Sequence, residues 1–276
     1  MDKKLLLGIG TAALSFAGVW WLKQNLPLAP KVPLVDENTV LLFEFTYSPY
    51  CVKVAKIMDF KGIPYKTVNL LPFVNKKFVK SLSGQGLVPV IKHRGKIISD
   101  STAIAKYLEE IKPEPSIFIN DDNTLNQEVH LLEDWSDESL EPPFAKLAMI
   151  YLFEHPEVII ESDEYNTGVE IFDKNKQMIV PFITKIKLKD YGIDTSEKDV
   201  LKKRVRGYLD MLSSRLEKSD FLVGGRLTLA DIAVASHLTV AEKVPYIYED
   251  DNYTHIFNWQ KDIFKAARRK LASSNI

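Results

Sequence analysis

Apolar and polar positions divide the chain into three regions with different patterns. Residues 5–22 form an uncharged apolar run of about 18 residues, whose length as a helix nearly matches the ~30 Å hydrocarbon core of a bilayer. From residue 39 to residue 113 short β-rich runs alternate with helical spacing, and from residue 123 helical spacing prevails. The pattern therefore predicts a transmembrane helix, then an α/β domain, then an all-helical domain.

Residues 1–24 are predicted to be a membrane anchor, and the proline-containing residues 25–38 an extended tether. Residue types common at a membrane interface flank the apolar run, namely Lys3, Lys4, Trp20, Trp21 and Lys23. The alternatives are a signal peptide cleaved near Ala17 and a core helix of the folded part. Positive charges on the two sides are nearly balanced, so they do not orient the helix.

The α/β region contains a helix with a well-marked start. Residues 40–46 suit a strand buried on both faces, because a single carboxylate interrupts the β-rich run. Ser48 is a preferred N-cap residue and Pro49 suits the first helical position, so the helix should begin there and end at Gly62. A strand, a polar helix, a hairpin and a further helix are predicted at residues 65–69, 75–83, 88–98 and 100–112.

The second half of the chain has a helical pattern. After a linker at residues 112–122, apolar residues recur on one helical face at Leu125, Val129, Leu132 and Trp135. Thr228, followed three residues later by Asp231, predicts a capping box at the start of a helix. Residues 154–198 mix apolar and charged positions, and helices joined by a loop are predicted for them.

Composition and charge exclude several classes of protein. The chain has 276 residues, 46% of them apolar, with 36 basic against 37 acidic residues. Neither a disordered chain nor a nucleic-acid-binding protein is expected from these values. Cys51 is the only cysteine, which excludes an intrachain disulfide and a cysteine-based zinc site. The five histidines show no metal-ligand spacing, so no metal site is predicted.

Four short segments carry a resemblance to a known family. They are SPYC at residues 48–51, GIPY at 62–65, the pair Val88-Pro89, and Asp100-Ser101 at a helix start. Together with residues 224–231 (GGRLTLAD), they resemble the glutathione transferase superfamily over residues 39–270. The resemblance implies the class α/β plus all-α, with a thioredoxin-like βαβαββα domain at residues 39–113. A helical bundle at residues 123–271 would follow it.

The resemblance implies that Ser48 faces the thiol of glutathione, the co-substrate of this family. A serine hydroxyl forms no mixed disulfide, but it can donate a hydrogen bond that favours the thiolate. Lowering a thiol pKa by one unit requires ~1.4 kcal/mol, and a charge-assisted hydrogen bond contributes ~1.5 to 3 kcal/mol. Ser48 therefore indicates conjugation of glutathione to an electrophile, and the alternative is that it serves only as an N-cap. Membrane-associated prostaglandin E synthases of type 2 are also similar at the N-terminus, but they have cysteine at this position.

The other site residues follow from the same resemblance. Cys51 is a secondary candidate, either a buried apolar residue or, if exposed, a nucleophile. Glutathione is expected to contact Tyr50, the backbone of Val88 before Pro89, and the pair Asp100 and Ser101, which would hold its γ-glutamyl end. Candidate walls for a second substrate are Tyr47, Tyr50, Trp135, Phe144 and Tyr151.

The sequence thus predicts a membrane-tethered glutathione transferase that acts on a small apolar electrophile. The alternatives are a glutathione-binding or scaffold module without catalysis, and a thiol transferase or isomerase that depends on Cys51. The membrane would be contacted through residues 5–22. The domain is expected to face the cytosol, where glutathione is reduced. A homodimer is possible, because dimers are common in this family.

Overall fold

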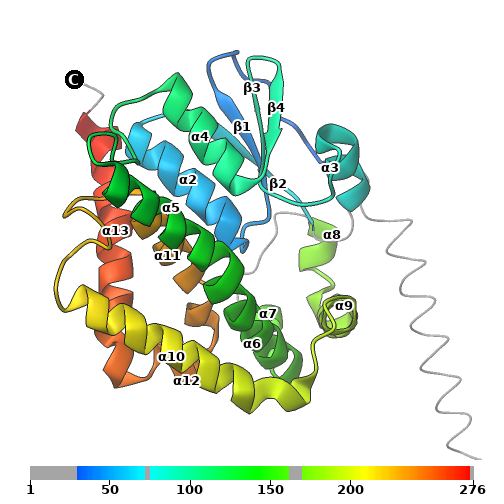
Figure 1. Ribbon diagram of the computed structural model, residues 1–276. Coiled ribbons are helices and arrows are strands. Elements are labelled where there is room, and N and C mark those ends of the chain that lie inside the picture. Colours follow the sequence, from blue (N-terminus) through cyan, green and yellow to red (C-terminus); the bar gives the residue numbers. More distant parts are fainter. Residues whose placement is uncertain (1–29, 72–74, 162–169, 274–276) are drawn as a thin grey trace, which may run out of the picture.

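The computed structural model describes residues 30–71, 75–161 and 170–273 (Figure 1). The predicted anchor at residues 5–22 lies outside these ranges. Within them, no helix combines the length and the apolar composition that crossing a bilayer requires. The end of the predicted tether contacts the folded domain, because Val35 packs on its core and Asp36 accepts a 2.7 Å hydrogen bond from the Thr39 hydroxyl.

In the described part of the chain, one four-stranded sheet has the order β2-β1-β3-β4. The strands are β1 (Val40–Glu44), β2 (Tyr65–Asn69), β3 (Val90–His93) and β4 (Lys96–Ser99). β1 pairs in parallel with β2 and antiparallel with β3, which forms a hairpin with β4. The prediction that the first strand is buried on both faces is confirmed, since its side chains alternate between two apolar clusters.

Three helices cover the two faces of this sheet. They are α2 (Pro49–Lys61), α3 (Lys76–Ser83) and α4 (Ser101–Ile111). Apolar side chains of α2 and α4 pack with Val40 and Leu42 on one face, and Val79 of α3 packs with Leu41 and Phe43 on the other. This order and layering confirm the predicted thioredoxin-like βαβαββα domain.

The rest of the described chain is helical, as predicted. The longer helices are α5 (Asn123–Trp135), α6 (Glu141–Glu154), α9 (Lys176–Asp190), α10 (Lys198–Leu216), α11 (Leu229–Leu238) and α13 (Thr254–Ser273). The shorter ones are η1 (Ser136–Leu140), α7 (Glu157–Glu161), α8 (Glu170–Asp173), η3 (Thr195–Glu197), η4 (Ala241–Lys243), α12 (Pro245–Tyr248) and η5 (Asp251–Tyr253). η1 is a π-helical segment that joins α5 to α6, and this interruption was not predicted.

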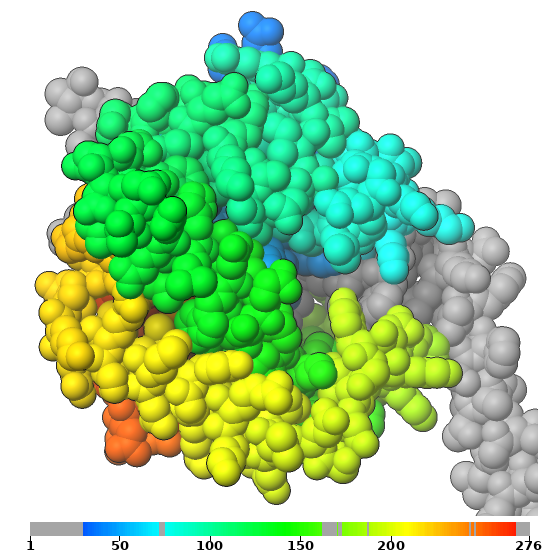
Figure 2. Space-filling model, in the orientation of Figure 1, coloured from blue at the N-terminus to red at the C-terminus, as the bar shows by residue number. Residues whose placement is uncertain are grey.

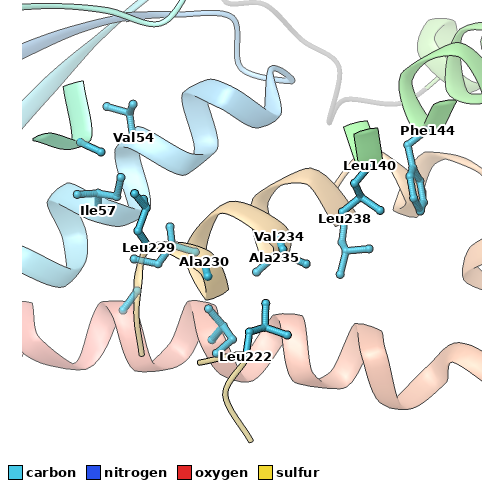
Figure 3. Close-up of a cluster of buried hydrophobic side chains, with 14 of the residues drawn as sticks. Val54, Ile57, Leu140, Phe144, Leu222, Leu229, Ala230, Val234, Ala235 and Leu238 are labelled. Carbon is cyan, nitrogen blue, oxygen red and sulfur yellow. The ribbon is translucent and has the colours of Figure 1, made fainter. Parts of the chain in front are cut away.

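Helix α11 lies at the centre of the contact between the two domains. All ten of its residues are buried, and it packs against α2, α5 and α13 (Figure 1). Figure 3 shows Val54 and Ile57 of α2 near Leu229 and Ala230 of this helix. The predicted capping box is confirmed, because Asp231 accepts a 2.8 Å hydrogen bond from the N–H of Thr228. The C-terminal domain thus fixes α2 from the side opposite the sheet.

Candidate functional site

A cavity of about 950 Å³ lies between the two domains. Figure 2 shows the surface hollowed between the cyan part of the N-terminal domain and the yellow-green part of the C-terminal domain. Seven residues singled out from the sequence line the cavity, namely Tyr47, Ser48, Tyr50, Val88, Pro89, Asp100 and Ser101. Cys51 is not among the lining residues. Segments far apart in the sequence therefore meet at one place.

Ser48 occupies the N-cap position of α2 at the cavity wall. Its backbone is extended, and its carbonyl accepts the hydrogen bonds from the N–H groups of Cys51 and Val52, at 2.9 and 3.0 Å. Its hydroxyl, however, forms no capping hydrogen bond with the helix. The prediction of an N-cap is thus correct for the position but wrong for the side-chain contact, and the Ser48 side chain instead hydrogen-bonds with the Cys51 thiol.

Cys51 is fully buried, one turn into the same helix. Burial raises the pKa of its thiol to about 12, although hydrogen bonds with the Ser48 side chain and the Phe45 backbone lower it. At neutral pH the group is therefore a protonated thiol without access to the cavity. A buried, protonated thiol is a poor nucleophile, so this placement disfavours the alternative that depends on Cys51.

The two other predicted segments come from the loop before β3 and from the start of α4. The Val88-Pro89 peptide bond is cis, and both residues line the cavity. Asp100 is the N-cap of α4, and its carboxylate accepts a 2.8 Å hydrogen bond from the N–H of Ala103. Its φ angle of 78° lies in the left-handed region, which is uncommon for a residue other than glycine and frequent at functional sites. Ser101, the next residue, is buried.

Tyr50 links the first turn of α2 to the C-terminal domain. Its hydroxyl donates a 3.0 Å hydrogen bond to the backbone carbonyl of Asp137, and its ring meets the His237 ring edge to face at 4.8 Å. Burial and nearby carboxylates, above all Glu141, raise the pKa of the Tyr50 hydroxyl, which therefore stays protonated. The Tyr50 hydroxyl is thus hydrogen-bonded within the protein, and the remaining part of the Tyr50 side chain can face a ligand in the cavity.

The structure brings together a buried group of charged residues that the sequence interpretation missed. We call it the interdomain cluster, and it consists of Lys53 of α2, Thr102 of α4, Glu133 of α5, Asp137 of η1 and His237 of α11. Lys53, Glu133 and His237 are completely buried, and the Asp137 side chain is 12% exposed at the cavity wall. A histidine inside a largely apolar helix was the available signal, because a buried polar residue needs a partner.

Short contacts hold the interdomain cluster together. The Lys53 ammonium lies 2.5 Å from Oε1 of Glu133 and 2.7 Å from Oδ2 of Asp137. Oε1 of Glu133 also accepts a 2.5 Å hydrogen bond from the Thr102 hydroxyl. The other carboxylate oxygen of Asp137 lies 2.7 Å from Nε2 of His237, so Nε2 carries the proton that this contact requires. The cluster therefore joins both domains through side chains alone.

The charge states in the interdomain cluster follow from its contacts. Burial would raise the pKa of Asp137, but hydrogen bonding to His237 and the charge of Lys53 bring it below its usual value. Burial lowers the pKa of His237 despite the neighbouring carboxylate. At neutral pH Asp137 is thus a carboxylate and His237 a neutral imidazole, so the interdomain cluster holds two negative charges and one positive charge.

The wall contributed by the C-terminal domain differs from the predicted one. Tyr47 and Tyr50 line the cavity, but Trp135, Phe144 and Tyr151 do not. The prediction for these three is wrong, because helical spacing places Phe144 in the core at zero exposure and sets the Trp135 ring against Tyr208. The apolar wall instead includes Met149, Leu152 and Ile193. Periodicity alone does not tell a core face from a cavity face.

Glu141, in the first turn of α6, is the most perturbed carboxyl of this wall. It lines the cavity, and burial, with the charge of Asp137, raises its pKa to about 7 although hydrogen bonding to Tyr50 lowers it. Close to neutral pH it is therefore partly protonated. The described residues contain no group of three histidine, cysteine or carboxylate side chains that could hold a metal ion.

Comparison with known proteins agrees with this architecture. A model of the glutathione S-transferase N-terminal domain matches residues 42–116, and one of the C-terminal domain matches residues 176–266. A probable glutathione transferase of Aplysia californica is 38% identical over 72 residues, which are 25% of this chain and 76% of that protein. The chain belongs to the glutathione transferase superfamily. Its likeness to the prostaglandin E synthase group stays a prediction.

Other members of the superfamily match in part. Glutathione S-transferase DHAR2 of Arabidopsis thaliana is 36% identical over 69 residues. The matched part is 25% of this chain and 32% of that relative, so the chain spans about a third of the relative's length. The crystal structure of beta-etherase LigF from Sphingobium sp. strain SYK-6 shares 21% identity with a TM-score of 0.63, covering 86% of this chain and 99% of that one. Ure2p in complex with glutathione shares 16% identity, with a TM-score of 0.59, over 85% and 98%. These two structures support the fold.

Proposed function

We propose that this member of the glutathione transferase superfamily binds glutathione in the interdomain cavity and conjugates it through its sulfur to an electrophile, with Ser48 as the residue that stabilises the thiolate. The observation that carries the proposal is the state of Ser48. It stands at the start of α2 on the cavity wall, and its hydroxyl is not used to cap the helix. The positive end of the helix dipole favours an anion at this place.

The binding mode follows from the segments around Ser48. The backbone of Val88, before the cis peptide bond to Pro89, would pair with the cysteinyl part of glutathione in the manner of an added strand. The start of α4 would receive the γ-glutamyl end, with Ser101 and backbone N–H groups toward its carboxylate and the exposed Asp100 toward its ammonium. The solved structure of Ure2p is a complex with glutathione, and its fold likeness supports the choice of ligand. Glutathione would thus lie along the N-terminal wall.

The chemical step is a nucleophilic substitution or addition at carbon. The thiol first gives its proton to solvent, and the Ser48 hydroxyl donates a hydrogen bond to the resulting thiolate. A sulfur electron pair then forms a C–S bond with the electrophile. In a substitution the leaving group departs with the electron pair of the bond that breaks, and in an addition the electron pair of the attacked double bond moves onto the substrate, which takes up a proton from solvent. Met149, Leu152 and Ile193 on the opposite wall suit an apolar second substrate.

Calorimetry with reduced glutathione, followed by turnover of 1-chloro-2,4-dinitrobenzene, tests this function. Binding together with release of chloride supports a transferase. Binding without turnover across a panel of electrophiles would instead favour a glutathione-binding module without catalysis. Absence of binding would contradict the proposal as a whole. Attachment to a membrane through residues 5–22 is part of the same proposal, supported by the apolar run and its flanks.

A further inference from the structure

The interdomain cluster contacts the starts of two helices that border the cavity. Lys53 follows Ser48 by five residues on α2, and Thr102 directly follows Ser101 on α4. Tyr50, in the first turn of α2, donates its hydroxyl to the backbone of Asp137. The interdomain cluster therefore includes, or is bonded to, side chains on the same helices as residues that line the cavity.

A single carboxylate oxygen joins these two helices. Oε1 of Glu133 accepts hydrogen bonds from Lys53 and from Thr102, each at 2.5 Å. The other oxygen of Glu133 is buried and has no hydrogen-bond partner among the described residues. Because the partners of Oε1 come from α2 and α4, a shift of either helix start would break a contact to a buried charge. Such a loss is costly, since the remaining charge has no access to water.

The net charge of the interdomain cluster also depends on the two helices. Two carboxylates face one ammonium, and the neutral His237 adds no charge. One negative charge would remain uncompensated by side chains within the described cluster. Lys53 lies in the second turn of α2 and Thr102 in the first turn of α4, and the N-terminal end of a helix carries a partial positive charge of roughly +0.5. A shift of either helix would therefore change how the excess charge is stabilised.

We propose that Glu133 and Asp137 are positioning residues, which hold the first turns of α2 and α4 in the one arrangement that glutathione requires. They act through Lys53, Thr102 and Tyr50, and Glu133 is fully buried and does not line the cavity. This inference rests on the proposed function, because it assumes that Ser48 and Ser101 hold the two ends of one ligand. In some proteins buried ionic groups fix a specific geometry while adding little to stability, and the interdomain cluster is proposed to act in this way.

Thr102 offers a test that leaves all charges unchanged. Thr102→Val keeps the shape of the side chain but removes the hydroxyl that bonds to Glu133, whereas Thr102→Ser keeps the hydroxyl. Calorimetry should show glutathione binding weakened about 3- to 10-fold in the valine variant, and within about 2-fold of the unmodified protein in the serine variant. Hydrogen exchange of the amides at residues 101–104 should be faster in the valine variant only.

His237 tests the other half of the interdomain cluster. His237→Leu removes the donor to Asp137, whereas His237→Gln can still donate a hydrogen bond and is uncharged. We expect the leucine variant to raise the apparent pKa of bound glutathione and to lower kcat about 3- to 30-fold with a smaller change in KM, because the Ser48 end is displaced. The glutamine variant should restore most of the activity.

If the interdomain cluster only stabilised the fold, a different outcome would be expected. Tyr253→Phe removes a 2.8 Å hydroxyl-to-carboxylate hydrogen bond to Asp210, and neither residue lines the cavity. If this variant weakens glutathione binding as much as Thr102→Val at the same loss of Tm, the positioning role is wrong. If the unmodified protein binds no glutathione, the proposed function fails, while amide exchange at residues 50–52 and 101–104 still tests the interdomain cluster. Unchanged exchange in Thr102→Val would then overturn the inference.

Discussion

Two residues at the start of α2, Ser48 and Cys51, show how position decides chemistry at the residue scale. Ser48 and Cys51 are three residues apart, yet the first lines the cavity and the second is fully buried. Nucleophilicity of a thiol depends on ionisation and access, and Cys51 has neither, with a pKa raised to about 12. Although a thiol is generally more reactive than a hydroxyl, Cys51 is therefore less suited than Ser48 to act on a ligand in the cavity.

Substitution of Ser48 should separate conjugation from thiol transfer. We expect Ser48→Ala to raise the apparent pKa of bound glutathione and to lower kcat/KM about 10- to 1000-fold, because the hydrogen bond to the thiolate is lost. Ser48→Cys should form a mixed disulfide with glutathione, since a helix N-terminus favours a thiolate. A pH–rate profile and mass spectrometry of the adduct provide the two measurements.

Cys51→Ala is the matched comparison in the same helix turn. Turnover should remain close to that of the unmodified protein, while the free energy of unfolding falls by about 1 to 2 kcal/mol because a small cavity is left in the core. If Cys51→Ala abolishes activity and Ser48→Ala retains it, conjugation at Ser48 is the wrong mechanism.

Glu141 should make stability depend on pH. Its folded pKa of about 7 lies above the ordinary value of 4.5, because burial disfavours the carboxylate. The folded state thus holds this proton more tightly than the unfolded chain, and stability is lost as pH rises from about 4.5 to about 7. The loss is on the order of 3 kcal/mol at most. Glu141→Gln should remove this part of the dependence, which urea unfolding at pH 5 and pH 8 would measure, and an unchanged slope would contradict it.

Elements with a local signal were the ones that the sequence predicted well. Pro49 and Gly62 delimit α2, and Thr228 with Asp231 starts α11, because caps act through neighbouring residues. The π-helical segment η1 gave no such signal, yet it positions Asp137 at the cavity. The partners of Lys53 were also hidden, since they come from 80 and more positions away in the chain.

The start of α4 yields a prediction at the scale of an element. Changing Asp100 and Ser101 together to alanine should weaken glutathione binding by about 2 to 4 kcal/mol, because two polar contacts to the γ-glutamyl end are lost. The free energy of unfolding should fall by only about 1 kcal/mol, the contribution of the cap that Asp100 forms with the N–H of Ala103. Calorimetry and thermal unfolding of the same double variant measure the two effects, and equal affinity would remove both residues from the site.

At the scale of the whole molecule, the site depends on both domains. The N-terminal domain contributes Ser48, Val88 and the start of α4, while the opposite wall and the carboxylates of the interdomain cluster come from the C-terminal domain. The likeness of the first half to a thioredoxin-like domain could be predicted from short motifs. The wall could not, because which face of α6 borders the cavity depends on how the two domains pack.

The boundary of the folded part gives the last prediction. Val35 packs on the apolar cluster that contains Leu41 and Phe43. The Asp36 carboxylate accepts a hydrogen bond from Thr39, and Asn38 accepts one from Arg94 at 2.9 Å. Deletion of residues 1–31 leaves these contacts intact, so the product should fold and keep its affinity for glutathione. Deletion of residues 1–38 removes them and should lower Tm by several degrees, since a loss of 1 kcal/mol corresponds to roughly 2 to 4 °C in a chain of this size.

The same pair of deletions tests the proposed anchor. The full chain should sediment with phospholipid vesicles, whereas the chain lacking residues 1–31 should remain in the supernatant, because the apolar run at residues 5–22 carries the proposed membrane contact. Replacing the central part of that run with charged residues is the matched control, since it keeps the length of the chain. Vesicle binding by the deleted chain would place the membrane contact on the folded domain, whereas loss of glutathione binding on deletion would show that the site needs residues before Val32.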